Sequence, residues 1–94
     1  MSNLFVSAVI KANPDKDLDL VRNELKKMIS ETQKEVGCFK FEGYEDNSEK
    51  GVFTLWEEFA DPEALAQHFR EPHTVAYINQ KLTSVVTANY TSSL

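Results

Sequence analysis

The sequence is poor in cysteine, glycine and proline, with one, three and three residues of these types among 94. The single cysteine, Cys38, cannot form an intramolecular disulfide, so the economical setting for the chain is a reducing cytoplasm. The sequence has no glycine-rich phosphate loop, no serine-centred nucleophile motif and no cofactor signature. Any chemistry therefore has to come from ordinary side chains, and we expect no cofactor.

Basic residues and long apolar runs are also scarce. Ten Lys and Arg face fifteen Asp and Glu, which leaves a net charge of −5. A chain this acidic has no basic stripe to neutralise phosphates. No apolar run approaches the roughly 20 residues of a membrane span. The N-terminus also lacks the basic segment and small-residue cleavage site of a signal peptide. We expect neither nucleic acid nor a membrane as a partner.

Strand and helix patterns alternate along the chain, whose length fits a single domain over residues 1–94. β-branched and aromatic residues predict strands at 4–11, at 38–44 and 51–59 around the polar turn EDNSEK, and in the C-terminal tail. The order strand, helix, two strands, helix pair, strand predicts an α+β ferredoxin-like sandwich. Its four-stranded antiparallel sheet would have the first and third strands in the middle and the helices on one face.

The first predicted helix begins at Asn13, a capping residue followed by Pro14, and ends at Gly37. Its apolar face recurs at intervals of three and four residues. That face consists of Leu18, Val21, Leu25, Met28, Ile29, Thr32 and Val36. The segment ADPEAL repeats the start signal of ANPD and predicts a helix after the third strand. Pro72 interrupts this helix, and a second helical segment is predicted from about 73 to 86.

Apolar residues occupy both faces of the predicted strands. On the third strand, Phe53, Leu55 and Phe59 share one face, while Val52 and Trp56 lie on the other. The helices can cover only one face, so the other would expose a large apolar patch. We therefore expect a homodimer packed through the sheets, with a monomer that keeps an open apolar face as the alternative.

A carboxylate and a histidine stand at inward positions. By period two, Glu57 shares its strand face with apolar neighbours, and a buried charge needs a partner or a raised pKa. It is a candidate general base, an anchor that orients a histidine, or a rim residue bonded to backbone amides or a lysine. His68 follows Ala64 and Leu65 by four and three residues, so it lies on the inward face of its helix. A contact with Glu57 is sterically plausible. The pair is our catalytic candidate, although a lone inward histidine is also common as a core residue.

The remaining candidates are one histidine and several aromatic residues. His73 lies in the first turn after Pro72, where it can be a polar rim, a cap or a lid over the helix break. Because His68 and His73 are five residues apart across a proline, whereas ligands on one helical face are three or four apart, no metal site is expected. The aromatic residues either form a pocket for a planar substrate or fill the core and dimer face. They are Trp56, Phe39, Tyr77, Phe41 and Tyr90.

Three motifs together resemble a known family. A Glu-x-Gly-Cys segment precedes the second strand, an aromatic residue and a glutamate lie on the third strand, and two histidines flank a proline break. The residues involved are Glu35, Gly37, Cys38, Trp56, Glu57, Asp61, Ala64, His68, Pro72 and His73. This pattern resembles the antibiotic biosynthesis monooxygenase family of small dimeric α+β barrel proteins. The resemblance covers the whole chain in element order and residues 35–78 in detail.

The resemblance implies a cofactor-independent monooxygenase acting on a small quinol or polyketide-like aromatic, whose substrate itself reduces dioxygen. In that reaction His68 would move a proton and Glu57 would orient it or act as the base. The residues that would shape the pocket are Trp56, Phe39, Tyr77 and, at its rim, His73.

Two other functions remain open. Some relatives act on the phosphorylated autoinducer of quorum sensing, which implies isomerisation of a small phosphorylated ketone. Such a site needs a cationic grip, for which Arg70, Lys11 and Lys40 are candidates. The last alternative is a dimeric binding or stress domain without catalytic activity.

Overall fold

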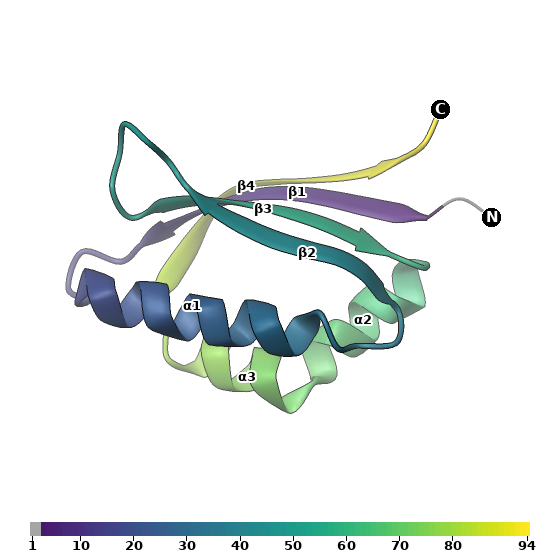
Figure 1. The fold of residues 1–94 in the computed structure, drawn as a ribbon, viewed down its shortest axis with the longest axis horizontal. Helices are drawn as coiled ribbons and strands as arrows, with labels where there is room; N and C mark the ends of the chain where they lie inside the picture. The colour runs from purple at the N-terminus through teal and green to yellow at the C-terminus, as the bar shows by residue number, and fades with distance from the viewer. Residues whose placement is uncertain (1–2) are drawn as a thin grey trace.

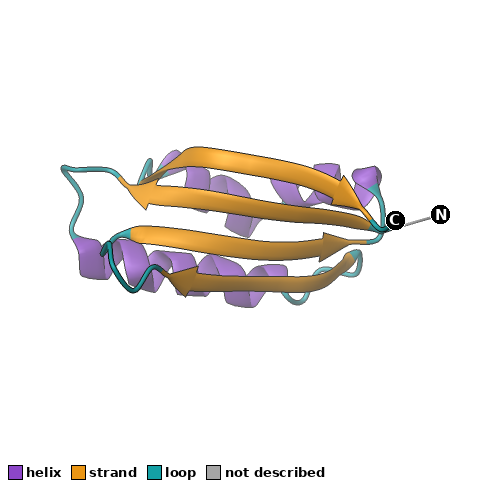
Figure 2. Ribbon diagram, turned by 90° about the horizontal axis from the view of Figure 1, so that it is seen from above, coloured by secondary structure: helices purple, strands orange, loops and turns teal. Residues whose placement is uncertain are grey.

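The computed structural model describes residues 3–94, in which four antiparallel strands form one sheet and three helices lie on one of its faces (Figures 1 and 2). The elements are β1 (Leu4–Ala12), α1 (Leu18–Thr32), β2 (Cys38–Glu45), β3 (Val52–Phe59), α2 (Pro62–Arg70), α3 (Pro72–Asn79) and β4 (Thr83–Ser92). The strand order is β2-β3-β1-β4, so β1 and β3 occupy the middle. The predicted ferredoxin-like α+β class is confirmed.

The inward face of the sheet forms the core together with one face of α1. Burial alternates along β1 and β3, as period two requires for a sheet covered on one side. In the register of the sheet, Val6 pairs with Glu57 on one side and with Tyr90 on the other. These three side chains therefore lie in one row across the inward face. The buried apolar cluster consists of Ala8, Ile10, Val21, Leu25, Met28, Cys38, Phe41, Phe53, Leu55, Phe59, Tyr77 and Leu82.

Helix α1 is shorter at both ends than its sequence pattern predicts. It begins at Leu18, where the Asp17 carboxylate accepts a hydrogen bond from the Leu20 amide at 2.9 Å. The prediction that Asn13 caps this helix is wrong, because its side-chain amide donates to the Lys81 carbonyl oxygen at 2.7 Å instead. The helix ends at Thr32 rather than at Gly37, and Val36, expected on its apolar face, is 98% exposed.

The second helical region follows its predicted start and break. The Asp61 carboxylate accepts from the Ala64 amide at 2.8 Å, and Pro62 opens α2. The backbone of Glu71 is extended, as expected before Pro72, and separates α2 from α3. The prediction of helix to residue 86 is wrong. Lys81 turns the chain with φ 53°, and the β-branched residues that follow pair with β1 as β4.

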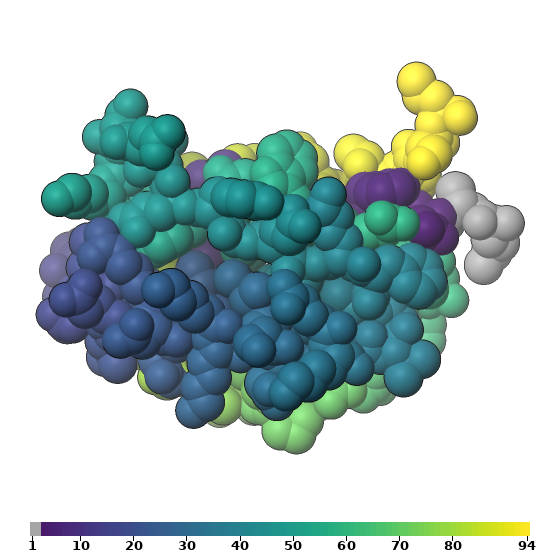
Figure 3. Space-filling view, viewed as in Figure 1, coloured from purple at the N-terminus to yellow at the C-terminus, as the bar shows by residue number. Residues whose placement is uncertain are grey.

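The outer face of the sheet carries no helix from residues 3–94 (Figure 2). Its exposed apolar side chains include Trp56 and Tyr44. The β2–β3 turn and the C-terminal residues rise above this face at opposite ends, whereas α1 lies directly against β2 on the side seen in Figure 3. Among residues 3–94 we find no helix long and apolar enough to span a membrane.

Candidate active site

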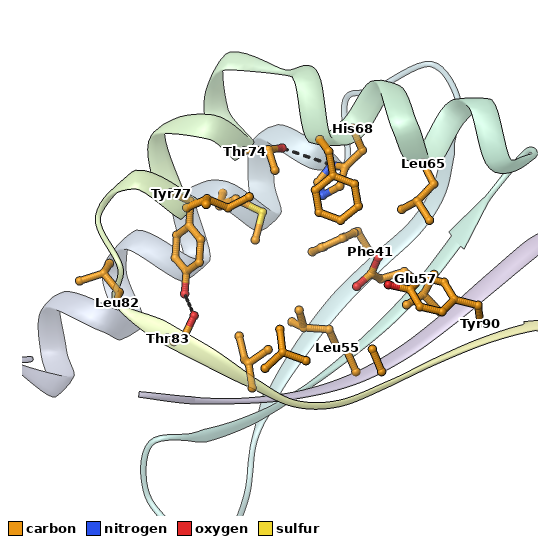
Figure 4. A pocket seen from close by; sticks show the side chains of 18 residues that line it. Phe41, Leu55, Glu57, Leu65, His68, Thr74, Tyr77, Leu82, Thr83 and Tyr90 are labelled. Carbon is orange, nitrogen blue, oxygen red and sulfur yellow. Dashed lines mark hydrogen bonds between the residues drawn. The ribbon is translucent and has the colours of Figure 1, made fainter. Parts of the chain in front are cut away.

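A cavity of about 360 Å³ lies between the inward face of the sheet and helices α2 and α3 (Figure 4). Its walls are mostly apolar side chains, a composition typical of small-molecule sites. Four lining residues are themselves well exposed and mark the mouth between the helices and β4. They are Phe69, Ile78, Val85 and Tyr90.

His68 projects into this cavity from the last turn of α2 and is almost completely buried. Its ring lies 5.4 Å from the ring of Phe41 and 5.5 Å from that of Phe59, centroid to centroid. The Nδ1 atom lies 2.8 Å from Oε2 of Glu35, in the loop between α1 and β2, and 3.3 Å from the Thr74 hydroxyl. A carboxylate oxygen accepts hydrogen bonds, so this contact assigns the hydrogen of the neutral ring to Nδ1.

The other ring nitrogen of His68 is left available. Nε2 has no hydrogen-bond partner among residues 3–94. Since no fully enclosed side-chain nitrogen or oxygen of the described residues lacks a partner, Nε2 is accessible, and we infer that it opens to the cavity that His68 lines. A histidine with a carboxylate on one nitrogen and a bare second nitrogen can act as a proton acceptor.

His73 binds the same carboxylate from outside the cavity. Its Nε2 lies 2.6 Å from Oε2 of Glu35, and the side chain borders a small separate hollow against α1. The break at Pro72 changes the direction of the chain between α2 and α3, which lets both imidazoles reach one oxygen. His73 therefore fixes the carboxylate that orients His68, while it does not line the cavity itself.

The position of Glu35 depends on a glycine two residues later. The Gly37 carbonyl oxygen accepts from the Ala60 amide at 2.9 Å, which holds the loop against the end of β3. A Cβ atom at Gly37 would lie 2.5 Å from Cβ of Ala64, so only glycine allows the loop this close to α2. The close approach brings the Glu35 carboxylate within reach of His68.

We expect Gly37→Ala to lower the free energy of unfolding by about 1 to 3 kcal/mol, because neither Cβ can move without the backbone. Denaturant unfolding measures the change. The double variant Gly37→Ala, Ala64→Gly removes the clash and should recover part of the loss. A Gly37→Ala protein as stable as the parent would contradict the close approach.

Glu57 faces His68 from the opposite wall, beside Tyr90 (Figure 4). It is 9% exposed, and its carboxyl has no hydrogen-bond partner among the described residues. Burial raises its pKa to about 7, because an ionised carboxylate is poorly solvated there. The predicted inward position of Glu57 agrees with the structure. The expected contact with His68 is wrong: Glu35 occupies the Nδ1 position, and Glu57 lies across the cavity.

Three of the four predicted pocket residues do not line this cavity, and His73, described above, is one of them. Trp56 is 49% exposed on the outer face of the sheet, because adjacent residues of a strand point to opposite sides. Phe39 lies at the irregularity between Cys38 and Lys40 in β2 and is also exposed. The expectation that Trp56, Phe39 and His73 line the same pocket as His68 is therefore corrected, whereas Tyr77 does line it.

Residues overlooked from the sequence complete the polar part of the site. Glu35 lies in a loop, where periodicity predicts no direction, and only the Glu-x-Gly-Cys motif singled it out. Thr74 lies beside His68, and Thr83 accepts or donates a hydrogen bond with the Tyr77 hydroxyl at 2.9 Å. Threonines at these positions carry no sequence signal that separates them from ordinary core residues.

The donor set that could hold a metal ion is Glu35, His68 and His73, whose ligand atoms all lie within 4.8 Å of one another. The spacing argument against this pair of histidines does not hold here, because that rule applies to one continuous helix, and the absence of a metal site stays a prediction. The contacts of 2.6 and 2.8 Å are hydrogen-bond lengths, so an ion would have to displace both imidazole hydrogens. The arrangement as it stands is a carboxylate held by two imidazoles.

No lysine or arginine lines the cavity among the described residues. Arg70 binds Glu63 and Gln67 on the surface, Lys11 pairs with Glu49, and Lys40 lies near Glu42. Each of these three candidate cations is therefore paired with surface residues and does not reach the cavity. Burial raises the pKa of the Cys38 thiol to about 11, so it stays protonated near neutral pH.

Fold and cavity together define a small α+β protein with a carboxylate-anchored histidine facing an apolar cavity. The chain belongs to the antibiotic biosynthesis monooxygenase family, which matches residues 3–80. The uncharacterized protein YjcS of Bacillus subtilis (strain 168) is 37% identical over 81 residues, covering 86% of this chain and 77% of that protein.

Solved structures agree with this assignment. YjcS superposes with a TM-score of 0.90 at 33% identity, covering 99% of this chain and 100% of that one. Rv0793 from Mycobacterium tuberculosis gives a TM-score of 0.84 at 29% identity, covering 99% and 96%. A structure described as an antibiotic biosynthesis monooxygenase shares the fold, with a TM-score of 0.76 at 18% identity over 100% and 97% of the two chains.

Proposed function

We propose that the cavity is the active site of a cofactor-independent monooxygenase for an uncharged quinol or polyketide-like aromatic. The observation that carries this proposal is the bare Nε2 of His68, which faces an apolar cavity while Glu35 holds Nδ1. Family membership supports the reaction class, and one solved relative is described as a possible oxidoreductase.

The chemistry asks little of the protein beyond proton transfer and orientation. His68 removes a phenolic proton through Nε2, and the resulting imidazolium donates its Nδ1 hydrogen to Glu35. The electron-rich anion then reacts with dioxygen. A quinol and dioxygen give a hydroxyquinone and one water, so the substrate supplies all four electrons and both hydrogens of that water. The apolar walls exclude bulk water from the reacting anion.

Glu57 serves the same reaction from the opposite wall. Because burial raises its pKa to about 7, a large share of the carboxyl is protonated at neutral pH. The protonated form donates a hydrogen bond to a substrate oxygen that gains negative charge. An ionised Glu57 would repel the anion, so activity falls as the pH rises through about 7.

The alternative functions have less support. Isomerisation of a phosphorylated ketone needs a cation at the phosphate, and none of the described residues that line the cavity is a lysine or arginine. A purely structural domain gains nothing from the Glu57 carboxyl, because burying it without a hydrogen-bond partner costs folding free energy. The cytoplasmic location expected from the single cysteine stays a prediction.

Oxygen uptake by chelator-treated protein tests the reaction, with a panel of reduced naphthoquinones and autoxidation subtracted. We expect at least one quinol to be consumed about 100-fold faster than its autoxidation, the contribution typical of a positioned base. One hydroxyquinone should form for each dioxygen. Uptake equal to the protein-free control throughout the panel would contradict the proposal, and turnover of a phosphorylated ketone would favour the isomerase.

We further propose that two copies pack through the outer faces of their sheets. The support is the exposed Trp56 and Tyr44 on a face that no helix of residues 3–94 covers. Large apolar side chains of this kind are typical of the centres of protein interfaces. The β2–β3 turn and the C-terminal residues rise at opposite ends of this face and would contact a second copy packed between them (Figure 3).

Trp56→Glu is expected to weaken dimerisation by about 30-fold or more, because it places a charge at the centre of the interface. Light scattering coupled to gel filtration measures the mass across a concentration series. Val75→Glu is the matched control, since Val75 is an exposed apolar residue of α3 on the helical layer. A parent protein that is monomeric at all concentrations would rule the dimer out.

A further inference from the structure

The end of the cavity remote from His68 holds a second polar pair. Tyr77 of α3 and Thr83 at the start of β4 both line the cavity, with their hydroxyl oxygens 2.9 Å apart. Two hydroxyls carry two hydrogens, and their mutual bond uses one of them. Neither oxygen has another partner among residues 3–94. One O–H hydrogen and several lone pairs are therefore left in an otherwise apolar region.

This pair is well separated from Glu57. Glu57 and Tyr90 flank Val6 near the start of β1, whereas Thr83 pairs with Ala12 at its end. That interval corresponds to about 20 Å of strand at about 3.3 Å per residue. Figure 4 shows Tyr77 and Thr83 on one side of the cavity and Glu57 with Tyr90 on the other. Burial raises the pKa of Tyr77, which keeps its phenol a hydrogen-bond donor.

We propose that the Tyr77–Thr83 hydroxyl pair is a binding subsite for an oxygen atom at the far end of the substrate. The inference rests on the proposed function, since it takes this cavity as the substrate site. The ligand class that satisfies both ends is an elongated, uncharged aromatic with a hydroxyl or carbonyl group at each end. One end lies at Glu57 and His68, and the other end takes the free hydrogen of the hydroxyl pair.

Matched ligand pairs test the subsite by calorimetric titration in the absence of dioxygen, so that no ligand is oxidised. The pairs are phenol with hydroquinone, 2-naphthol with 2,6-dihydroxynaphthalene, and 4-phenylphenol with 4,4′-dihydroxybiphenyl. Within each pair the second ligand adds one remote hydroxyl, and the series increases the distance between the two ends. For at least one of the longer pairs, we expect the diol to bind about 5- to 10-fold more tightly, as one added hydrogen bond allows.

Variants assign the preference to the hydroxyl pair. The double variant Tyr77→Phe, Thr83→Val removes both hydroxyls, so it should abolish the diol advantage and keep the affinity for the mono-hydroxyl ligand within about 2-fold. Thr83→Ser keeps both hydroxyls and should retain the advantage, and thermal unfolding checks that each variant folds cooperatively. Tyr90→Phe is the control, because Tyr90 lies at the Glu57 end of the cavity (Figure 4). Its diol preference should equal that of the parent.

Equal affinity for both members of all pairs would overturn the subsite, as would a preference that survives the loss of both hydroxyls in the double variant. Binding is measured without turnover, so the result is separate from the oxygen-uptake test. A diol preference that depends on the hydroxyl pair, in a protein that consumes no dioxygen, would support the subsite and contradict the monooxygenase.

Discussion

His68→Asn is expected to lower kcat/KM for the oxygen-dependent reaction by about 10²- to 10⁴-fold, the range that a positioned proton acceptor contributes. The asparagine amide occupies nearly the place of Nδ1 and can still donate to Glu35, whereas nothing replaces Nε2. The loss should therefore fall on kcat, with a smaller change in KM. Steady-state oxygen uptake on folded protein measures both constants.

Glu35→Gln separates orientation from proton transfer. It leaves His68 intact but removes the carboxylate that fixes its tautomer, so kcat should fall by about 10- to 100-fold, as for other residues that orient a functional histidine. A His68→Asn protein with parental activity would exclude His68 as the base. Parental activity in Glu35→Gln alone would show that the carboxylate serves stability and not orientation.

Glu57→Gln is expected to stabilise the protein at about pH 8, by on the order of 2 kcal/mol, while leaving its stability near pH 4.5 almost unchanged. Burial raises the pKa of Glu57 from 4.5 to about 7, so between these values the folded chain binds more protons than the unfolded chain. Its stability therefore decreases as the pH rises through this window. Glutamine has the same shape and no charge, so the Glu57→Gln protein does not lose stability as the pH rises.

Chemical denaturation at a series of pH values measures this difference. Glu58→Gln is the control, because Glu58 pairs with Asn3 on the outer face and should change stability by less than about 0.5 kcal/mol. The amide of Glu57→Gln also still donates a hydrogen bond, so its activity should persist above pH 7, where that of the parent falls. A stability difference that does not depend on pH would contradict a buried, titrating Glu57.

The fold was predictable because local patterns and tertiary structure agree. Alternating apolar residues in β1 and β3, the cap at Asp61 and the break at Pro72 all predicted what the structure contains. The ends of elements were less predictable, since competing partners decide them. Asn13 has a side chain suited to capping a helix, yet it forms a hydrogen bond to the Lys81 carbonyl oxygen across the fold and does not cap α1.

The candidate site likewise has a part that local sequence patterns predict and a part that depends on tertiary contacts. The inward direction of Glu57 follows from the strand period of two residues, and that of His68 from the helical period of 3.6. The strand period also placed Trp56 on the other face of the sheet. What periodicity could not predict is which carboxylate reaches His68. Glu35 arrives through a loop whose path depends on the contact between Gly37 and Ala64, and a sequence pattern does not encode such a tertiary distance.

The most direct test of the account is a ¹⁵N–¹H correlation spectrum of the imidazole side chains, which identifies the protonated nitrogen of each neutral ring. The chain has two histidines, so the spectrum of His73→Asn assigns both. We predict that neutral His68 carries its hydrogen on Nδ1 and that Nε2 is bare, with the Nδ1 hydrogen shifted downfield by Glu35. A hydrogen on Nε2 and a bare Nδ1 would contradict the account, because the cavity would then face a donor and not a base.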